Sequence, residues 1–240
     1  MIRLSLSAAS MHPMPRIPEL AQRDRFVRRA VSEARVLTLA DEETASVPSQ
    51  KLPGRTVQLF WSSPIEAGRW AEALAGNRAL QEIALPTFAA DILPGIAMAK
   101  GLVGTDWVSD PIEAEVDPKD LLIRLKAEAV PAYVSAARGR GEVYLVAGDD
   151  GPVLFSGNVK PGACGMLHVF ASRAEAERHM KRFGAKRVIA DPLVDFVAST
   201  LPWAAARAPS VMIEPIAGAG FIEIKIADLT RHLAPPAPVA

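Results

Sequence analysis

The chain has 240 residues, and its 27 basic residues balance 27 acidic ones, so the formal net charge is zero. A balanced charge gives no electrostatic attraction to nucleic acid or to an acidic membrane surface, and no apolar run approaches the roughly 18 residues of a membrane span. The single cysteine, Cys164, excludes an internal disulfide and is typical of a reducing compartment. We therefore predict a cytoplasmic protein without nucleic-acid or membrane partners.

The first half of the chain predicts a mixture of strands and helices. We assign residues 1–21 to an N-terminal leader, because residues 1–18 carry three prolines and an apolar pattern too broken for a signal peptide. Strands are expected at 36–40, weakly within 41–54, and at 56–61, 79–85 and 102–108; helices are expected at about 19–33, at 64–75, at 86–99 with a break or kink at Pro94, and from Pro118 to about 129.

A strand followed by a capped helix occurs twice. Residues 59–74 read LFWSSPIEAGRWAEAL, and residues 168–181 read HVFASRAEAERHMK. Ser63 with Glu66, and Ser172 with Glu175, have capping-box spacing, in which the serine hydroxyl accepts from the third helical amide and the glutamate reaches back. The two copies predict equivalent strand-to-helix turns.

The sequence around these copies is also similar at an offset of 107 to 109 residues. Leu85, Phe88, Leu93 and Pro94, for example, recur as Leu193, Phe196, Leu201 and Pro202. We predict an α+β fold with two tandem copies of a sheet-plus-helices domain, at 22–129 and 130–234, followed by a proline-rich tail at 235–240. In the second copy we expect strands at 142–147, 152–156, 163–170, 187–190, 211–216 and 221–226, and helices at 173–183, from Asp191 to about 206, and at 226–233.

Three segments resemble a bacterial domain-of-unknown-function family, number 2750. They are LFWSSPIEAGRWA, ILPGIA at 92–97 and LVGTDW at 102–107, followed by Asp117-Pro118. The resemblance covers roughly residues 22–127 and implies no catalytic residues. The strand-serine-helix unit is also similar, more distantly, to the SseB N-terminal domain family.

Five residues are candidates for a binding site. Asp106 and Trp107 end a predicted strand, and Glu214 holds the equivalent position in the second copy; loops at strand ends often carry function. Trp61 and Trp70 lie nine residues apart and are candidates for an aromatic binding face. The alternative for all five is structural, with tryptophans that bury area against the sheet and acids that border it.

A metal or nucleophilic site is less well supported. Cys164, His168 and His179 are the relevant side chains, but zinc needs three or four ligands, and a catalytic cysteine needs an activating base and an orienting group. We predict no catalytic residues, no metal and no cofactor.

Three functions remain open from the sequence. The first is a non-catalytic protein-binding or regulatory module. The second is an immunity- or secretion-associated binder, as the resemblance to SseB-like proteins implies. The third is an enzyme with an unrecognised site between the two repeats, since scattered catalytic residues leave no motif.

Overall fold

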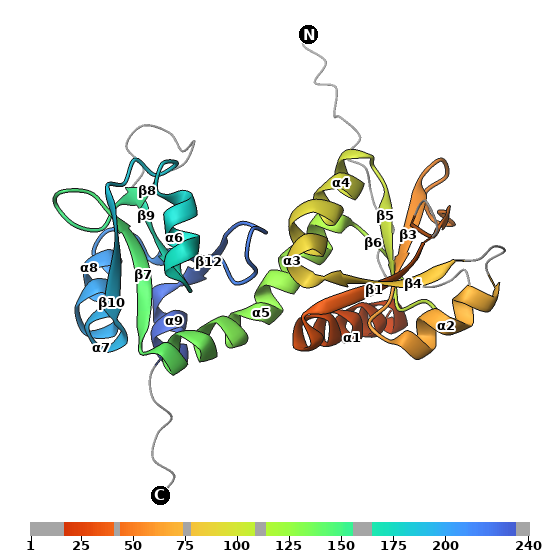
Figure 1. Ribbon diagram of the computed structural model, residues 1–240, viewed down its shortest axis with the longest axis horizontal. Helices are drawn as coiled ribbons and strands as arrows, with labels where there is room; N and C mark the ends of the chain where they lie inside the picture. The colour runs from red at the N-terminus through yellow and green to blue at the C-terminus, as the bar shows by residue number, and fades with distance from the viewer. Residues whose placement is uncertain (1–16, 41–43, 74–77, 109–113, 156–164, 234–240) are drawn as a thin grey trace, which may run out of the picture. The chain divides into compact units, whose positions relative to one another are not determined.

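The computed structural model describes residues 17–40, 44–73, 78–108, 114–155 and 165–233. Two compact units make up this part of the chain (Figure 1). Unit 1 comprises the residues up to Ala84 together with Pro94–Leu121, and unit 2 comprises Leu85–Leu93 together with the residues from Leu122 onward. Each unit combines strands with helices, which confirms the predicted mixture of α and β structure.

The strands of unit 1 form a two-stranded and a four-stranded sheet, with one parallel and several antiparallel pairs. β1 (Arg35–Ala40) pairs antiparallel with β4 (Ala79–Ala84), and β3 (Thr56–Phe60) pairs parallel with β5 (Leu102–Thr105). A bridge between Leu37 and Trp61 connects β1 to the end of β3. The other elements are β2 (Ser46–Pro48), β6 (Glu115–Val116), α1 (Ile17–Glu33) and α2 (Pro64–Ala73).

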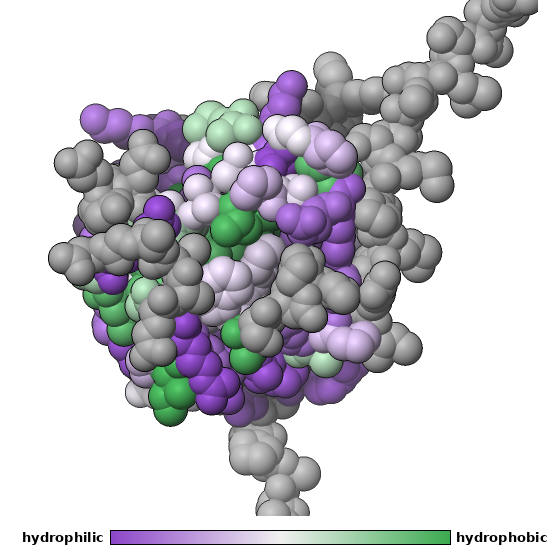
Figure 2. Space-filling model, turned by 90° about the vertical axis from the view of Figure 1, so that its right-hand side faces the viewer, coloured by the Kyte–Doolittle hydropathy of each residue, from purple (hydrophilic) through white to green (hydrophobic). Residues whose placement is uncertain are grey.

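The core of unit 1 follows from helical spacing and strand alternation. Phe26, Val27 and Ala30 of α1 are buried and lie on one face of the helix. Ala67 of α2 is buried in a cluster with Leu59 and other strand residues. Seen from the side that carries α2 and β3, hydrophilic residues border small, separate hydrophobic areas (Figure 2). Most of the apolar surface of these elements therefore faces inward.

Unit 2 has a sheet of the order β10-β7-β9-β11-β12, with β8 paired to β9. Its core contains Leu145, Leu167, Val169 and Val211, which are all buried. The strands are β7 (Glu142–Ala147), β8 (Leu154–Phe155), β9 (Met166–Phe170), β10 (Arg187–Pro192), β11 (Ser210–Ile213) and β12 (Ile222–Lys225), and the helices besides those below are α6 (Arg173–His179) and α9 (Ile226–Leu233).

A π-helical turn precedes each Leu-Pro pair. The predicted break at Pro94 is a continuous helical path through α3 (Leu85–Thr87), η1 (Phe88–Ile92) and α4 (Leu93–Met98), in which Leu93 N–H donates to the Phe88 carbonyl five residues back. The wider turn accommodates a proline that lacks an N–H and crowds the preceding turn. The second half has the same sequence of turns in α7 (Leu193–Asp195), η2 (Phe196–Thr200) and α8 (Leu201–Ala205).

Two predicted helix boundaries differ from the structure. Helix α1 begins at Ile17, two residues before its predicted start. Helix α5 (Pro118–Arg140) does not end near residue 129 but continues through Pro131. A buried stripe at four-residue spacing, Leu125, Ala129, Tyr133 and Ala137, offsets the cost of the proline, which is about 3 kcal/mol in a helix interior.

Elements from β7 to α9 follow the same order as those from β1 to α5, and their strand pairs correspond, except that β7 pairs with β9 where β1 meets the end of β3 in a single bridge. The register also agrees. The pair Arg35–Ala84 in the first half corresponds to Glu142–Pro192 in the second half. In the same way, the pair Leu59–Gly104 corresponds to His168–Met212.

Candidate functional site

Four of the five residues predicted to bind are buried. Asp106, Trp107 and Trp61 lie inside unit 1, and Glu214 lies inside unit 2, each exposed by 2% or less. Trp70 is partly buried against the same cluster as Trp61 and Trp107. These side chains offer little surface to a partner, and their binding role stays a prediction.

Asp106 fixes the corner after β5. Its backbone adopts φ +50°, a left-handed conformation that aspartate tolerates better than most residues. Its carboxylate accepts from Ser62 N at 2.6 Å and from Ser62 Oγ at 2.8 Å, and its carbonyl accepts from Gln22 Nε2 at 2.6 Å. Its amide donates to the Phe60 carbonyl. These bonds tie β5 to β3 and α1.

Two arginines of α1 balance the acids beside this corner. Arg25 Nε lies 3.6 Å from Asp106 Oδ2, and Arg25 and Arg29 lie 3.5 and 3.9 Å from Glu66 Oε1. Burial raises the pKa of Asp106, although the hydrogen bonds from Ser62 oppose that shift. Burial and then the neighbouring Asp106 charge raise the pKa of Glu66. Because Asp106 is fully buried, this cluster suits a structural role better than proton transfer to a substrate.

The aromatic residues of the GTDW corner pack tightly. Trp61 Nε1 donates to the Trp107 carbonyl at 2.8 Å, and Trp107 Nε1 donates to the Ala114 carbonyl at 3.0 Å. Trp70 lies 6.3 Å from Trp61 and 6.0 Å from Trp107 between ring centroids. A side chain at Gly104 would come within 3.0 Å of the Trp107 ring. The motif that resembles the family is thus explained by packing.

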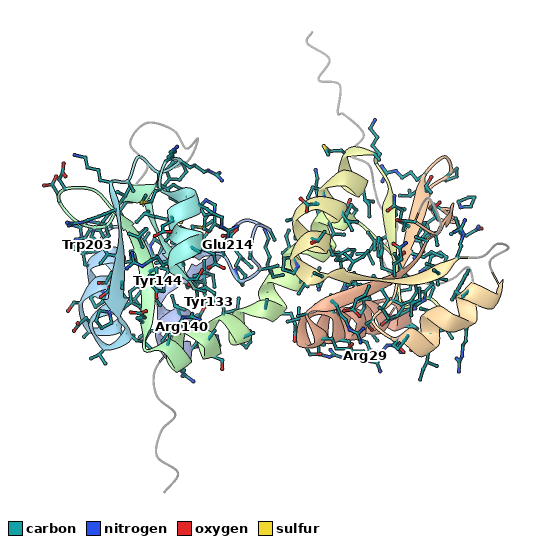
Figure 3. All side chains as sticks on the ribbon, viewed as in Figure 1. Arg29, Tyr133, Arg140, Tyr144, Trp203 and Glu214 are labelled. Carbon is teal, nitrogen blue, oxygen red and sulfur yellow. The ribbon has the colours of Figure 1, made fainter. Side chains whose placement is uncertain are left out.

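Glu214 forms a different buried cluster in unit 2. Its carboxylate accepts from Gly218 N and Gly220 N, at 3.0 and 3.3 Å, and lies 3.2 Å from His179 Nε2. Figure 3 shows Glu214 between α6, which carries His179, and the segment that leads to β12. Burial lowers the pKa of Lys126, and the nearby Glu214 charge opposes that shift.

His168 and His179, two of the side chains considered for a metal or nucleophilic site, both pack against Phe183 and Phe221. Cys164 lies outside the described residues. His168 is surrounded by Phe155, Phe183 and Phe221, and burial lowers its pKa to about 4. Within the described ranges, no group of histidine, cysteine or acidic side chains could hold a metal ion.

Strand β4, which sequence reasoning did not single out, is largely exposed. Five of its six residues are exposed, and Leu80 is 46% exposed. In the described part of the chain β4 pairs with β1 alone, so it is an edge strand.

Neighbouring hydrogen bonds show which β4 groups face outward. Leu37 exchanges both of its backbone hydrogen bonds with Trp61, on the side of β1 away from β4. Successive residues of a strand point these groups to opposite sides. Val36 and Thr38 therefore face β4, and their register partners are Ile83 and Gln81. The outward residues follow by alternation and are Leu80, Glu82 and Ala84. They present three N–H donors and the two carbonyl acceptors of Leu80 and Glu82, because the carbonyl of Ala84 caps the helix that begins at Leu85.

The corresponding edge strand of unit 2, β10, is less open to strand addition. The Val146 carbonyl accepts from Val153 N, so the backbone groups of Val146 face away from β10. Its register partner Val188 therefore points its backbone groups outward, and by alternation so do Ala190 and Pro192. Pro192 has no N–H to donate, and proline at a sheet edge hinders strand addition. Four of the six β10 residues are also only partly exposed.

Comparison with known families and structures supports part of the resemblance noted in the sequence. Residues 23–125 match the family described as "Protein of unknown function (DUF2750)", which confirms the predicted resemblance of the first half. The match covers less than half of the chain. The relationship to the SseB family stays a prediction, and no curated protein matches.

Two solved structures are similar over most of the chain, but weakly. One is "Anabaena Tic22 (protein transport)", 14% identical, which covers 89% of this chain and 99% of its own with a TM-score of 0.24. The other is "Tic22 from Plasmodium falciparum", 10% identical, which covers 80% of this chain and 93% of its own with a TM-score of 0.22. These scores are too low to infer a shared fold or function. None of the helices in the described ranges is long and apolar enough to cross a membrane.

Proposed function

We propose that the protein is a non-catalytic protein-binding module that adds an extended segment of its partner to the edge of β4. The observation that carries this proposal is the row of outward N–H groups on Leu80, Glu82 and Ala84, with the outward carbonyls of Leu80 and Glu82 between them. Strand addition takes its affinity from such main-chain groups and its specificity from alternate side chains. Natural sheets usually protect a long edge with proline, charge or a covering element, and β10 carries Pro192 where β4 carries Ala84.

We also infer that the two halves arose by internal duplication, with one half retaining the open edge. The shared order of elements, the shared registers and the two π-helical turns before Leu-Pro pairs support this inference. After such a duplication the first copy would keep the binding edge, and the second copy would have a structural role only.

An affinity capture with edge-blocking variants tests the binding function. The bait is the full chain, as wild type or as Ala84→Pro, which copies the proline that β10 already carries. Because the Ala84 N–H faces outward, the substitution removes no hydrogen bond to β1. Val188→Pro is the matched control, since it blocks an outward position of β10.

We expect proteins captured from an extract of the native cell to fall at least about tenfold with Ala84→Pro and to be retained by Val188→Pro. Circular dichroism checks that each variant folds, and Leu80→Pro replaces Ala84→Pro if the latter does not. Equal capture by all three baits would reject the β4 edge as the binding surface.

A further inference from the structure

We propose that the segment added to β4 is basic, with a lysine or arginine opposite Glu82 and an apolar side chain opposite Leu80, and that each chain binds one such segment. This inference rests on the proposed function and assigns a partner chemistry to the same edge. It follows from the charges and side chains that face the incoming strand.

One face of β4 carries the residues that decide specificity. Leu80, Glu82 and Ala84 point to the same face, because side chains alternate along a strand. Their register partners Leu39 and Leu37 belong to the cluster that contains Ala67 of α2, so this is the face that α2 covers. An apolar residue opposite Leu80 would extend that cluster outward.

The charge on this face is negative at the edge. Arg35 forms ion pairs with both Glu33 and Glu82, so two carboxylates share one guanidinium. The Glu82 side chain is 60% exposed and is the outermost of the three. A cross-strand pair of opposite charge contributes roughly 0.2–1 kcal/mol, and like charges directly opposite are destabilising. A basic residue opposite Glu82 would therefore give the two carboxylates a second positive charge.

The same charge disfavours a second copy of this chain as the occupant. Antiparallel pairing of β4 with its own copy about a twofold axis perpendicular to the sheet, with Glu82 at the centre, places Glu82 against Glu82. Centred on Gln81, it places Leu80 against Glu82. A six-residue strand pair also buries little area beside the roughly 1,200–2,000 Å² of a stable interface. The β4 edge therefore favours a foreign segment over self-association.

A peptide selection tests the basic partner. Seven-residue random peptides displayed on phage are selected on full-length wild type, Glu82→Lys, Ala84→Pro and the control Val188→Pro, and the enriched pools are sequenced. On wild type we expect lysine or arginine, two residues from an apolar position, to be enriched about fivefold, the factor that 1 kcal/mol gives. Glu82→Lys should shift the preference to aspartate and glutamate. Val188→Pro should select the same peptides as wild type.

Each result separates the two proposals. Peptides that depend on Ala84 but show no charge preference would overturn the basic partner and leave strand addition standing. Pools that do not differ between wild type and Ala84→Pro would overturn both. A change of oligomeric state with Ala84→Pro, measured by light scattering, would assign the edge to a second copy and overturn the foreign partner.

Discussion

At the scale of single residues, two buried acids occupy equivalent places by different means. Asp106 accepts from the amide and hydroxyl of Ser62, whereas the longer Glu214 reaches the amides of Gly218 and Gly220. Both glycines have φ near +76°, a conformation that other residues rarely adopt. Each acid thus satisfies its carboxylate locally, as buried charges must.

Gly104 is required for the packing of the GTDW corner. A Cβ there would lie 2.7 Å from Leu59 Cδ2 and 3.0 Å from Trp107 Cε2. We expect Gly104→Ala to lower the free energy of unfolding by about 1–3 kcal/mol, the usual cost of overpacking. Denaturant unfolding measures the change. Gly95→Ala is the control, because no atom lies within 4 Å of its Cβ and alanine favours the helix. Equal effects of the two variants would contradict the packing role.

His168 should make stability depend on acid. Burial lowers its folded pKa to about 4, while its pKa in the unfolded chain is near 6.5. The unfolded state therefore binds the proton first, and stability that is present above pH 6.5 is lost as the pH falls towards 4. We expect wild type to lose on the order of 3 kcal/mol relative to His168→Phe over this range.

The measurement is the free energy of unfolding of wild type and His168→Phe at several pH values between 4 and 7. The exposed His232 supplies the control, and His232→Gln should follow the wild-type profile. Parallel profiles for wild type and His168→Phe would show that the buried imidazole does not cause the acid dependence.

At the scale of elements, local signals were sufficient where they were strong. The bounds predicted for β7 and α9 are those of the structure, because alternating apolar residues or a turn sequence mark both ends. The continuation of α5 past Pro131 was not predictable, since burial of the residues that follow the proline outweighs a local breaking signal. β6 has two residues and leaves no pattern.

The site was harder to predict than the fold. Asp106 and Glu214 were found as acids at strand ends, but their burial depends on partners such as Ser62 and Gly218 that lie elsewhere in the sequence. The open edge of β4 depends on which strand lies beside it. In the sequence, the difference between the two edges is visible only at one aligned position, where Ala84 of the first half corresponds to Pro192 of the second at an offset of 108.

The second capping box should contribute measurably to stability. Ser172 Oγ accepts from Glu175 N, and the Glu175 carboxylate accepts from Ser172 N, as the sequence predicted. Loss of such a cap typically costs about 1 kcal/mol, so Ser172→Ala should lower the melting temperature. Ser135→Ala makes the same chemical change at an exposed position within α5 and should leave the temperature unchanged or raise it slightly. A loss with Ser135→Ala as large as that with Ser172→Ala would argue against the cap.

At the scale of the whole molecule, the two compact units do not follow the two repeats predicted from the sequence. Residues Leu85–Leu93 lie within the predicted first repeat but belong to unit 2, and α5 begins in unit 1 and continues into unit 2. Phe88 and Ala89 in that segment are fully buried. A segment whose side chains are buried in one unit should lose its protection when that unit opens.

Hydrogen exchange can test this assignment with two matched cavity variants. Leu167→Ala removes a buried side chain from the core of unit 2, and Leu59→Ala does so in unit 1; such changes cost about 2–5 kcal/mol. We expect Leu167→Ala to speed exchange in 85–93 together with β7 and β9, while β3 and β5 stay protected. Leu59→Ala should do the reverse. If 85–93 instead followed β3 and β5, the segment would fold with the rest of the predicted first repeat, and the boundary between the units would coincide with the predicted repeat boundary.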